Sequence, residues 1–324
     1  MKAIVYHRYG TPDELHLKEI AHPTPKADEV LVKIHAASVN SWDWDLLTGQ
    51  PRVYRLLFGL FKPKFPIIGS DIAGKVEAVG NHVHHLKPGD EVFGDISGTG
   101  FGAFAEYVCA KENLLAIKPS GMTFEEAAAT PQAGVLALQG LRQGNIQAGQ
   151  KVLINGAGGG VGTFAIQLAK MWGAEVTAVD STAKLELMRT LGADHVIDYK
   201  QEDYTKNGQQ YDLILDVIAR RTVQDYMRAL RPGGRFVMVG GSVPLILRIL
   251  LTGSRLGKRE YKKISILMHQ PNKDDLKELT QLFESGKVKP VIDKVYPLSK
   301  TAEAVRYLGE GHTKGKVVIA CINS

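Results

Sequence analysis

A glycine-rich turn between an apolar run and a helix-forming stretch restricts the fold of this chain more than any other feature. Residues 155–162 read Asn-Gly-Ala-Gly-Gly-Gly-Val-Gly, after the apolar run 151–155 and before the stretch 163–172. Glycines at such a turn let the backbone approach a pyrophosphate, while the helix N-terminus presents unpaired N–H groups to the anion. This context predicts dinucleotide binding, and a tight turn that binds nothing is the alternative. The predicted binding residues are Gly156, Ala157, Gly158, Gly159, Gly160, Val161 and Gly162.

The pattern around this turn predicts an α/β fold. Near-continuous apolar runs are typical of parallel strands that are buried on both faces of a sheet. Such runs cover residues 151–155, 175–179, 195–199, 211–217, 235–239 and 263–268. Helix-forming stretches at 163–172 and 183–191 separate the first three runs, and Gly192 is a helix stop. We therefore predict a Rossmann domain with a doubly wound parallel sheet over residues 123–268.

The two ends of the chain have a different pattern. Before residue 122, short apolar runs alternate with turn residues, which is typical of a mostly β unit. These runs cover 29–35, 72–79, 91–94 and 103–108. After residue 271 we expect a polar helix at 273–285, strands at 288–296 and 316–320, and a helix at 301–309. The sequence therefore predicts a second domain made of residues 1–122 and 269–324.

The choice between NAD(H) and NADP(H) depends on the end of the second predicted strand. Asp180 lies 18 positions after Gly162, close to the spacing of an acid that binds the ribose in NAD(H) enzymes. Ser181, Thr182 and Lys184 follow and are suited to a 2′-phosphate, although Ser181 or Thr182 could instead cap the next helix. We expect NADP(H), with NAD(H) as the alternative because of Asp180. Further cofactor contacts are predicted at strand ends, at Tyr199, Val217, Gly240 and Gly241.

Several ordered segments are similar to the zinc-free quinone oxidoreductases of the medium-chain dehydrogenase/reductase superfamily. The most extensive match is the turn and helix at 157–170, and nearly the whole chain resembles this family. The other matching segments are 37–40, 69–74, 87–92, 192–194 and 315–318. The bacterial relatives of reticulon-4-interacting protein are the branch it most resembles. The resemblance implies a GroES-like catalytic domain beside the Rossmann domain, an active site in the cleft, and a homodimer or higher oligomer.

The resemblance also indicates that zinc is absent. Zinc alcohol dehydrogenases hold catalytic zinc through sulfur and nitrogen ligands. Asn40 aligns with the first cysteine ligand of those enzymes and Ser70 with a histidine ligand. A four-cysteine lobe is missing near residues 96–104, and Cys109 and Cys321 cannot supply it. A histidine cluster before a Pro-Gly turn is predicted to be a solvated loop; it consists of His82, His84 and His85.

Without zinc, hydrogen-bond donors must stabilise the charge that develops on a substrate oxygen during hydride transfer. The resemblance places Asn40 in the cleft, where its amide would orient a carbonyl or the nicotinamide ribose. Tyr54 is a phenol that would hydrogen-bond a quinone oxygen or pass a proton. Asp43 would orient neighbouring groups, and Trp44 would stack on a flat substrate. The alternatives are, in the same order, a turn-forming asparagine, a packed tyrosine, a helix N-cap and a core tryptophan.

The predicted function is NAD(P)H-dependent reduction of a quinone, an α,β-unsaturated carbonyl or another carbonyl compound. Apolar residues at 54–65 and 243–251 are expected in loops beside the cleft, which indicates a small lipophilic substrate, or else they form oligomer contacts. Because a fold does not determine a function, the alternative is a non-catalytic dinucleotide-binding sensor or an RNA-binding protein on the same fold.

Composition and charge add limits on location and partners. The 324 residues, 44% hydrophobic and 23% charged, are ordinary for a globular protein with two domains. The two cysteines, the charged N-terminus and the lack of a long apolar run predict a cytoplasmic protein without a membrane span. Part of the net charge of +6 lies at Arg255, Lys258, Arg259, Lys262 and Lys263. We expect a solvated loop there and no nucleic-acid partner.

Overall fold

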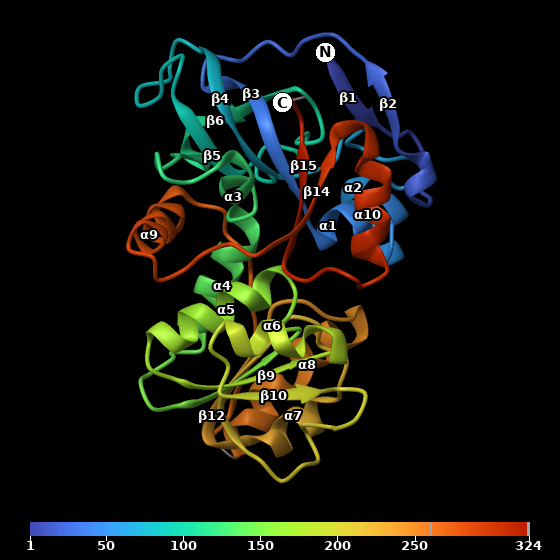
Figure 1. The fold of residues 1–324 in the computed structure, drawn as a ribbon. Coiled ribbons are helices and arrows are strands. Elements are labelled where there is room, and N and C mark those ends of the chain that lie inside the picture. Colours follow the sequence, from blue (N-terminus) through green and yellow to red (C-terminus); the bar gives the residue numbers. More distant parts are fainter. Residues whose placement is uncertain (260, 323–324) are drawn as a thin grey trace. The chain divides into compact units, whose positions relative to one another are not determined.

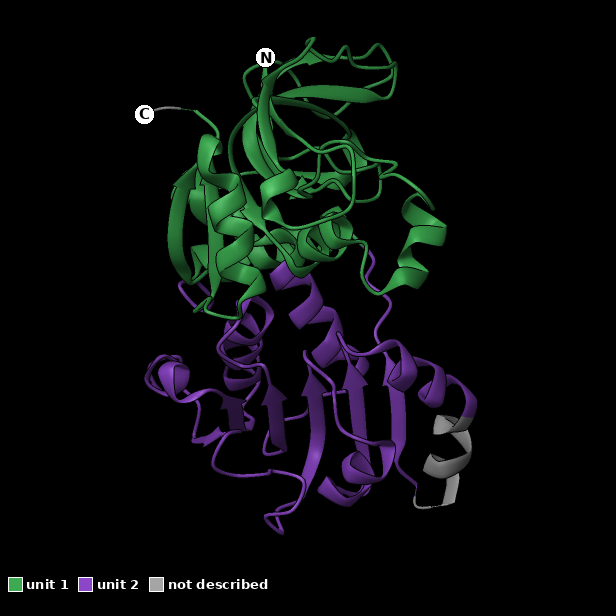
Figure 2. Cartoon of the chain, turned by 90° about the vertical axis from the view of Figure 1, so that its right-hand side faces the viewer, with its two compact units in different colours: residues 1–132, 271–285, 290–324 green, residues 133–270, 286–289 purple. Residues whose placement is uncertain are grey.

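The chain forms two compact units in the computed structural model, which describes residues 1–259 and 261–322, without the side chains of 252–259 (Figure 1). Unit 1 consists of Met1–Gln132, Pro271–Ser285 and Pro290–Ser324, and unit 2 of Ala133–Gln270 and Gly286–Lys289 (Figure 2). The first segment of unit 1 extends ten residues past the expected boundary at 122, because helix α3 (Phe124–Ala128) packs on the sheet of unit 1.

Unit 2 contains a six-stranded parallel sheet with the order β10-β9-β8-β11-β12-β13. Figure 2 shows these strands pointing the same way. The strands are β8 (Lys151–Asn155), β9 (Glu175–Asp180), β10 (His195–Asp198), β11 (Tyr211–Asp216), β12 (Leu230–Met238) and β13 (Lys263–Ile266). The order runs outward in both directions from the β8–β11 pair, which confirms the predicted doubly wound sheet. The carboxyl ends of β8 and β11 lie at the point where the winding reverses.

Unit 2 has a helix at one position where the sequence predicted a loop. The helices of this unit are α4 (Pro131–Gln143), which starts in unit 1, α5 (Gly160–Met171), η4 (Thr182–Lys184), α6 (Leu185–Thr190), α7 (Val223–Ala229) and α8 (Val243–Arg259). Residues 243–251 were expected in a loop and instead begin α8. The buried Leu245 and Ile249 lie four residues apart, which is helical spacing, and Pro244 is tolerated in a first helical turn.

Unit 1 is built around a seven-stranded sheet and a two-stranded sheet. The strands are β1 (Lys2–Val5), β2 (His16–Glu19), β3 (Glu29–Val39), β4 (Asp71–Val79), β5 (Glu91–Asp95), β6 (Tyr107–Lys111), β7 (Leu115–Ile117), β14 (Ile292–Pro297) and β15 (Lys316–Ala320). The larger sheet has the order β14-β15-β3-β4-β5-β7, with β6 also paired to β3. The C-terminal strand β15 therefore lies directly beside β3 and pairs with it in antiparallel fashion.

Three further sequence expectations for unit 1 change in the structure. The strand expected at 103–108 begins only at Tyr107, because Ala103 to Ala105 are buried without forming a regular ladder. The strand expected from 288 begins at Ile292. The loop expected at 54–65 contains a helical turn, α2. The helices are η1 (Pro12–Glu14), α1 (Ser41–Thr48), η2 (Arg52–Tyr54), α2 (Arg55–Phe58), η3 (Glu112–Leu114), α3, α9 (Lys273–Glu284), η5 (Leu298–Lys300) and α10 (Thr301–Gly309).

Each unit has its own core of buried apolar side chains. In unit 1 the core includes Val32, Ile34 and Ile72 from the strands together with Leu47 from α1. In unit 2 it includes residues of β11 and β12 and the buried aromatic side chains of α7 and the loop before β11. Within the described part of the chain, none of the helices has the length and apolar character that crossing a membrane requires.

Candidate functional site

The glycine turn of unit 2 joins β8 to α5 at the carboxyl edge of the sheet. Gly156 has a φ of 78°, a conformation that favours glycine, and its N–H donates to Val179 O at 3.0 Å. The N–H of Ala157 donates to the same oxygen at 3.1 Å. Helix α5 begins at Gly160, three residues earlier than expected. Its first N–H groups, at Gly160, Val161 and Gly162, have no acceptor within the helix, so they can bind an anion.

Three glycines of this turn are required by the fold itself. Gly156 needs its positive φ. A Cβ atom built on Gly162 would lie 2.3 Å from Gly156 O, and one on Gly158 would lie 2.7 Å from the Cβ of Lys184. Any side chain at these two positions would therefore clash with the turn or with Lys184.

Gly159 differs from Gly156, Gly158 and Gly162. Its φ of −91° suits any residue, and a Cβ built there would approach only Gly156 O, at an ordinary 3.5 Å. Neither backbone conformation nor packing requires glycine at 159. The open space lies at the N-terminus of α5, where a pyrophosphate would approach the backbone. The turn therefore fits a dinucleotide.

Asp180, at the end of β9, is bound to the glycine turn. Its Oδ2 accepts from the Gly158 N–H at 2.9 Å, its Oδ1 accepts from the Ser181 N–H at 2.8 Å, and the Lys184 ammonium lies 3.4 Å from Oδ1. Both side chains are buried. Lys184 therefore compensates the charge of Asp180 and is not the free cation that was expected for a 2′-phosphate. The compensation also weakens the repulsion that Asp180 would exert on such a phosphate.

The other residues predicted to contact the ribose or its 2′-phosphate differ in whether their side chains already make hydrogen bonds. The Thr182 hydroxyl donates to Asp198, so it is already used. Ser181 precedes η4 without a capping hydrogen bond from its side chain, so the capping alternative does not hold. Tyr199 follows β10 and is 49% exposed. Lys200, which was not among the predicted residues, is exposed beside it.

A polar pair, the half-buried Asn155 and the buried Asp216, lies at the point where the strand order reverses. Asn155 at the end of β8 donates to Asp216 Oδ1 at the end of β11, at 2.8 Å. Asp216 also accepts from the Tyr204 hydroxyl at 3.3 Å and the Ile218 N–H at 3.0 Å, and burial raises its pKa. Neither residue was predicted as part of the site, although Asn155 ends the apolar run 151–155 and Asp216 lies next to the end of the run 211–217. They hold the two strand ends together next to the glycine turn.

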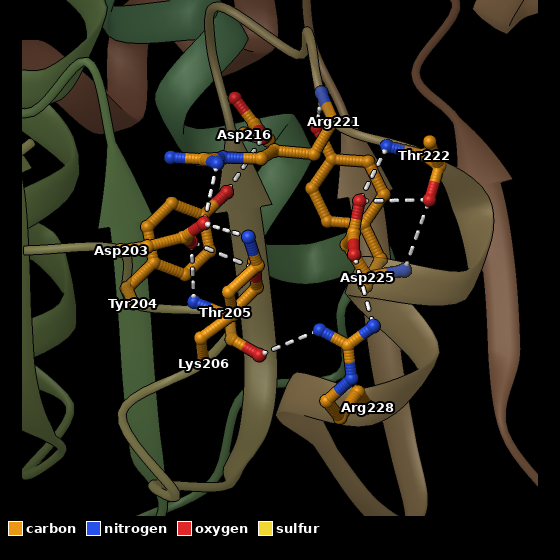
Figure 3. Close-up of polar contacts among 10 residues, drawn as sticks. Asp203, Tyr204, Thr205, Lys206, Asp216, Arg221, Thr222, Asp225 and Arg228 are labelled. Atoms are coloured by element: carbon orange, nitrogen blue, oxygen red, sulfur yellow. Dashed lines mark hydrogen bonds and ion pairs between the residues drawn. The ribbon is translucent and has the colours of Figure 1, made fainter.

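Figure 3 shows the contacts that hold the segments around Asp216. Arg221 donates to Asp203 at 2.6 Å, and Thr222 caps α7 through Asp225. Arg228 in turn binds Asp225 at 3.0 Å. Arg221–Asp203 and the bond from Arg228 to Thr205 O, at 3.2 Å, fix the loop before β11 to α7, while Asp225 holds Thr222 and Arg228 within the helix.

Close packing requires glycine at two positions shortly after β12, Gly240 and Gly241. A Cβ on Gly240 would lie 2.6 Å from Val217 O, and one on Gly241 would lie 2.8 Å from Ala219 O. Ala219 and Gly241 form a parallel bridge that extends the β11–β12 pair. The half-buried Val217 donates its N–H to Asn155 O at 3.0 Å. The predicted approach of the nicotinamide to these residues stays a prediction.

In unit 1, Asn40 belongs to a fully buried polar network. Lys316, the first residue of β15, donates to Asn40 Oδ1 and lies 3.4 Å from Asp71 Oδ2. Asn40 Nδ2 donates to Asp71 Oδ2 at 2.9 Å, and the Ser38 hydroxyl donates to the same oxygen at 2.9 Å. Burial raises the pKa of Asp71 and lowers that of Lys316. The order β15-β3-β4 brings these residues together, since β3 precedes Asn40 directly and β4 begins at Asp71.

This network orients the Asn40 amide. Its oxygen accepts from Lys316, and one Nδ2 hydrogen donates to Asp71, so the amide cannot flip without losing both contacts. Among the described residues, the second Nδ2 hydrogen has no acceptor. Asp71 and Lys316 lay inside segments that carried the family resemblance, yet their pairing was missed because 245 positions separate them.

Asp43, the third residue of α1, has a positioning role. Its Oδ2 accepts from the Asn40 N–H at 2.7 Å and its Oδ1 from the Gly69 N–H at 2.9 Å. The side chain is 0% exposed, and burial raises the pKa of the carboxyl to about 7. Asp43 therefore fixes the backbone of Asn40 and Gly69, and its predicted role in orienting neighbouring groups stays a prediction.

The two tryptophans of α1 have different surroundings. Trp44 packs on α10, where a Cβ built on Gly309 would lie 2.1 Å from its ring, so it is a core tryptophan rather than the predicted stacking platform. Trp42 instead stacks on Tyr54, with ring centroids 5.8 Å apart and planes at 19°. Trp42 was missed. The Tyr54 hydroxyl makes no hydrogen bond with the described residues, and partial burial raises its pKa.

The described residues contain no group of three or more His, Cys, Asp or Glu side chains arranged to hold a metal ion. At the position predicted to have lost its zinc ligands, the Asn40 amide and the Asp71 carboxylate both bind Lys316. The Ser70 hydroxyl is fully buried and has no hydrogen-bond partner among the residues that the structure describes. These donors do not fit the sulfur and nitrogen ligands of a catalytic zinc. His82, His84 and His85 are exposed, as expected for a solvated loop.

The basic segment lies only partly within the described side chains. Lys262 is buried and donates to Met227 O at 2.8 Å, so it cannot contact a nucleic acid. Lys263 is exposed on β13. The side chains of Arg255, Lys258 and Arg259 lie outside the described residues.

Comparisons with known proteins agree with this architecture. Residues 26–120 match the alcohol dehydrogenase GroES-like domain, and residues 191–319 match a family described as zinc-binding dehydrogenase. The chain is 38% identical to the NADPH-dependent alkenal/one oxidoreductase, chloroplastic, of Arabidopsis thaliana, over 98% of this chain and 79% of the relative. It is 33% identical to human NAD(P)H oxidoreductase RTN4IP1, mitochondrial, with 98% and 89% covered. The structure of the quinone oxidoreductase from Coxiella burnetii matches 99% of both chains, with 30% identity and a TM-score of 0.89.

Proposed function

Because this chain belongs to the medium-chain dehydrogenase/reductase superfamily, among the relatives of quinone oxidoreductases, we propose that it is an NAD(P)H-dependent oxidoreductase that reduces quinones or α,β-unsaturated carbonyl compounds. The observation that carries this proposal is the open space at Gly159, which the fold does not require and a pyrophosphate would use. A bound nicotinamide dinucleotide supplies the hydride for such a reduction. The N–H groups of Gly160, Val161 and Gly162 would hold its pyrophosphate.

The polar residues of unit 1 would donate hydrogen bonds to the substrate oxygen. The Asn40 amide is held in one orientation by Lys316 and Asp71 and has an Nδ2 hydrogen to donate. A fixed donor stabilises developing oxygen charge without reorganising during the reaction. The Tyr54 hydroxyl is a second donor that no described residue uses, and Trp42 supports its ring. Asn40 and Tyr54 are therefore the proposed catalytic residues, and Asp43, Asp71 and Lys316 are positioning residues.

We favour NADP(H) as the cofactor. Lys184 and two backbone N–H groups hold the Asp180 carboxylate, which reduces its repulsion of a 2′-phosphate. The Ser181 hydroxyl and the exposed Tyr199 and Lys200 are candidates to contact that phosphate. The Arabidopsis relative is named as NADPH-dependent, which supports the same choice. NAD(H) remains the alternative if Asp180 turns to a ribose hydroxyl.

We also propose that the reaction is independent of zinc and that the protein works in the cytoplasm as a homodimer or higher oligomer. The Lys316 contacts at Asn40 and Asp71 support the first part. The relatives reported above carry chloroplastic or mitochondrial in their names, so location needs its own measurement.

Titration with NADPH and NADH, followed by nicotinamide fluorescence, tests the proposal directly. We expect tighter binding of NADPH and its oxidation when 9,10-phenanthrenequinone or an enal is added, with full activity after dialysis against a chelator. Binding without turnover over a panel of acceptors would favour the sensor alternative. Binding of neither nucleotide would refute the proposal.

A further inference from the structure

The segment formed by η2, α2 and the residues up to Phe65 in unit 1 is attached through its aromatic side chains. Phe58 makes edge contacts with Trp42 and Phe101, with centroids 5.7 and 6.3 Å apart. Phe65 contacts Phe101 at 5.3 Å, and Tyr54 stacks on Trp42. These contacts use the inner side of the segment and hold it on the sheet domain.

The outer side of the same segment is apolar and exposed. Leu56 and Leu57 are 70% and 71% exposed, and Phe61 is 91% exposed. Together with the half-exposed Val53 and Leu60, they form what we call the apolar edge. Single exposed apolar residues are ordinary, but several within nine positions indicate a surface that binds a partner.

The charges within this segment have one sign. The sequence has no Asp or Glu from residue 46 to residue 70. Arg52, Lys62 and Lys64 are exposed, and no ion pair joins them to other described residues. Arg55 points elsewhere, since its guanidinium donates to Gly49 O and covers the Tyr9 ring. The edge is therefore an apolar strip flanked by uncompensated cations.

We propose that the apolar edge docks on an anionic lipid surface. Leucine and phenylalanine side chains enter the interface between headgroups and acyl chains, while flanking Lys and Arg bind anionic headgroups. A nucleic acid would use the cations and leave the exposed Leu57 and Phe61 in water. A lipid surface uses both features. Docking of this kind goes beyond the proposed function, and it would bring the protein to the phase where lipophilic quinones dissolve.

Co-sedimentation of the full chain with vesicles tests this proposal. We expect binding to vesicles of phosphatidylglycerol and phosphatidylcholine, and at least ten-fold weaker binding to pure phosphatidylcholine. The Leu57→Asp/Phe61→Asp double variant should lose at least ten-fold in partition. Lys62→Gln/Lys64→Gln should weaken binding only to the anionic vesicles and reduce its salt dependence. The matched control is Val295→Asp, at an apolar position that is 50% exposed on β14, which should bind as the wild type does.

Two further measurements separate docking from its rivals. Urea unfolding of each variant verifies the fold of unit 1, which carries the substitutions. NADPH titration reports on the glycine turn of the other unit and tests the proposed function without lipid. Sedimentation velocity without lipid reports self-association. The proposal fails if the wild type does not bind anionic vesicles, or if the double variant binds them equally. It also fails if the double variant only dissociates an oligomer, which would make the edge an interface between copies of this chain.

Discussion

Replacement of Gly159 by alanine separates cofactor binding from folding. A Cβ at 159 would meet only Gly156 O, at an ordinary 3.5 Å, and the backbone there suits alanine. Loss of a glycine at a helix N-cap costs a few tenths to about 1 kcal/mol, and reduced freedom of the unfolded chain offsets part of this. We therefore expect the free energy of unfolding to change by less than about 1 kcal/mol.

The effect on cofactor binding should be much larger. The added methyl group would occupy the space beside the N-terminus of α5 and displace a pyrophosphate from its N–H donors. Two hydrogen bonds to a charged group contribute roughly 3 kcal/mol or more, so the Kd for NADPH should rise at least about 100-fold. Fluorescence titration measures the Kd, and urea unfolding measures the stability.

Two other glycines serve as controls for this experiment. A Cβ on Gly121 meets no heavy atom within 4 Å, so Gly121→Ala should leave both quantities unchanged. Gly162→Ala should instead destabilise unit 2 by several kcal/mol, because its Cβ would lie 2.3 Å from Gly156 O. If Gly159→Ala bound NADPH as tightly as the wild type, the pyrophosphate would not approach at Gly159, and the reasoning would be refuted.

Three further predictions concern unit 1. Asn40→Ala and Tyr54→Phe should each lower kcat by at least about ten-fold and change the Kd for NADPH by less than three-fold; unchanged turnover would remove them from the proposed catalytic residues. Lys316→Met leaves the buried Asp71 carboxyl unpaired, so urea unfolding should show a loss of about 3–5 kcal/mol, and a loss below about 1 kcal/mol would contradict the importance of the pair. Burial raises the pKa of Asp43 from 3.8 to about 7, so its protonated form favours the folded state. This stabilisation is complete below pH 4 and is lost as pH rises through 7. Urea unfolding at pH 5 and pH 8 should show a larger decrease in the wild type than in Asp43→Asn, and equal decreases would exclude Asp43 as a cause.

Local pattern in the sequence was sufficient for the architecture of unit 2. Buried parallel strands must be apolar throughout, and β8 and its glycine turn carry this signal within a few residues. The first strand of the sheet was therefore predicted with its observed bounds. The prediction of a loop at 243–251 was wrong, because a short apolar run has the same composition in a loop and in a helix. Only the contacts of Leu245 and Ile249 with the core distinguish the two.

The candidate site depended more on distant contacts. The sequence placed Asn40 and Tyr54 as candidates, but it did not show that Lys316 and Asp71 orient the Asn40 amide. It also favoured Trp44 over Trp42. Both lie on one short helix, and only the contact with Gly309 in the folded chain shows that the Trp44 ring is the packed one.

The sequence by itself determined the strand, turn and helix that form a dinucleotide site, since their signals lie between neighbouring residues. Tertiary structure alone decided that Gly158 and Gly156 are crowded, because a Cβ there would meet Lys184 or Ile218 from other elements. It also decided that Lys184 compensates Asp180 and that Lys316 meets Asp71 across 245 positions. The physical reason is that a charged side chain interacts with its neighbours in space. The order of the strands in the sheet sets these neighbours, and this order follows from the packing of the whole chain.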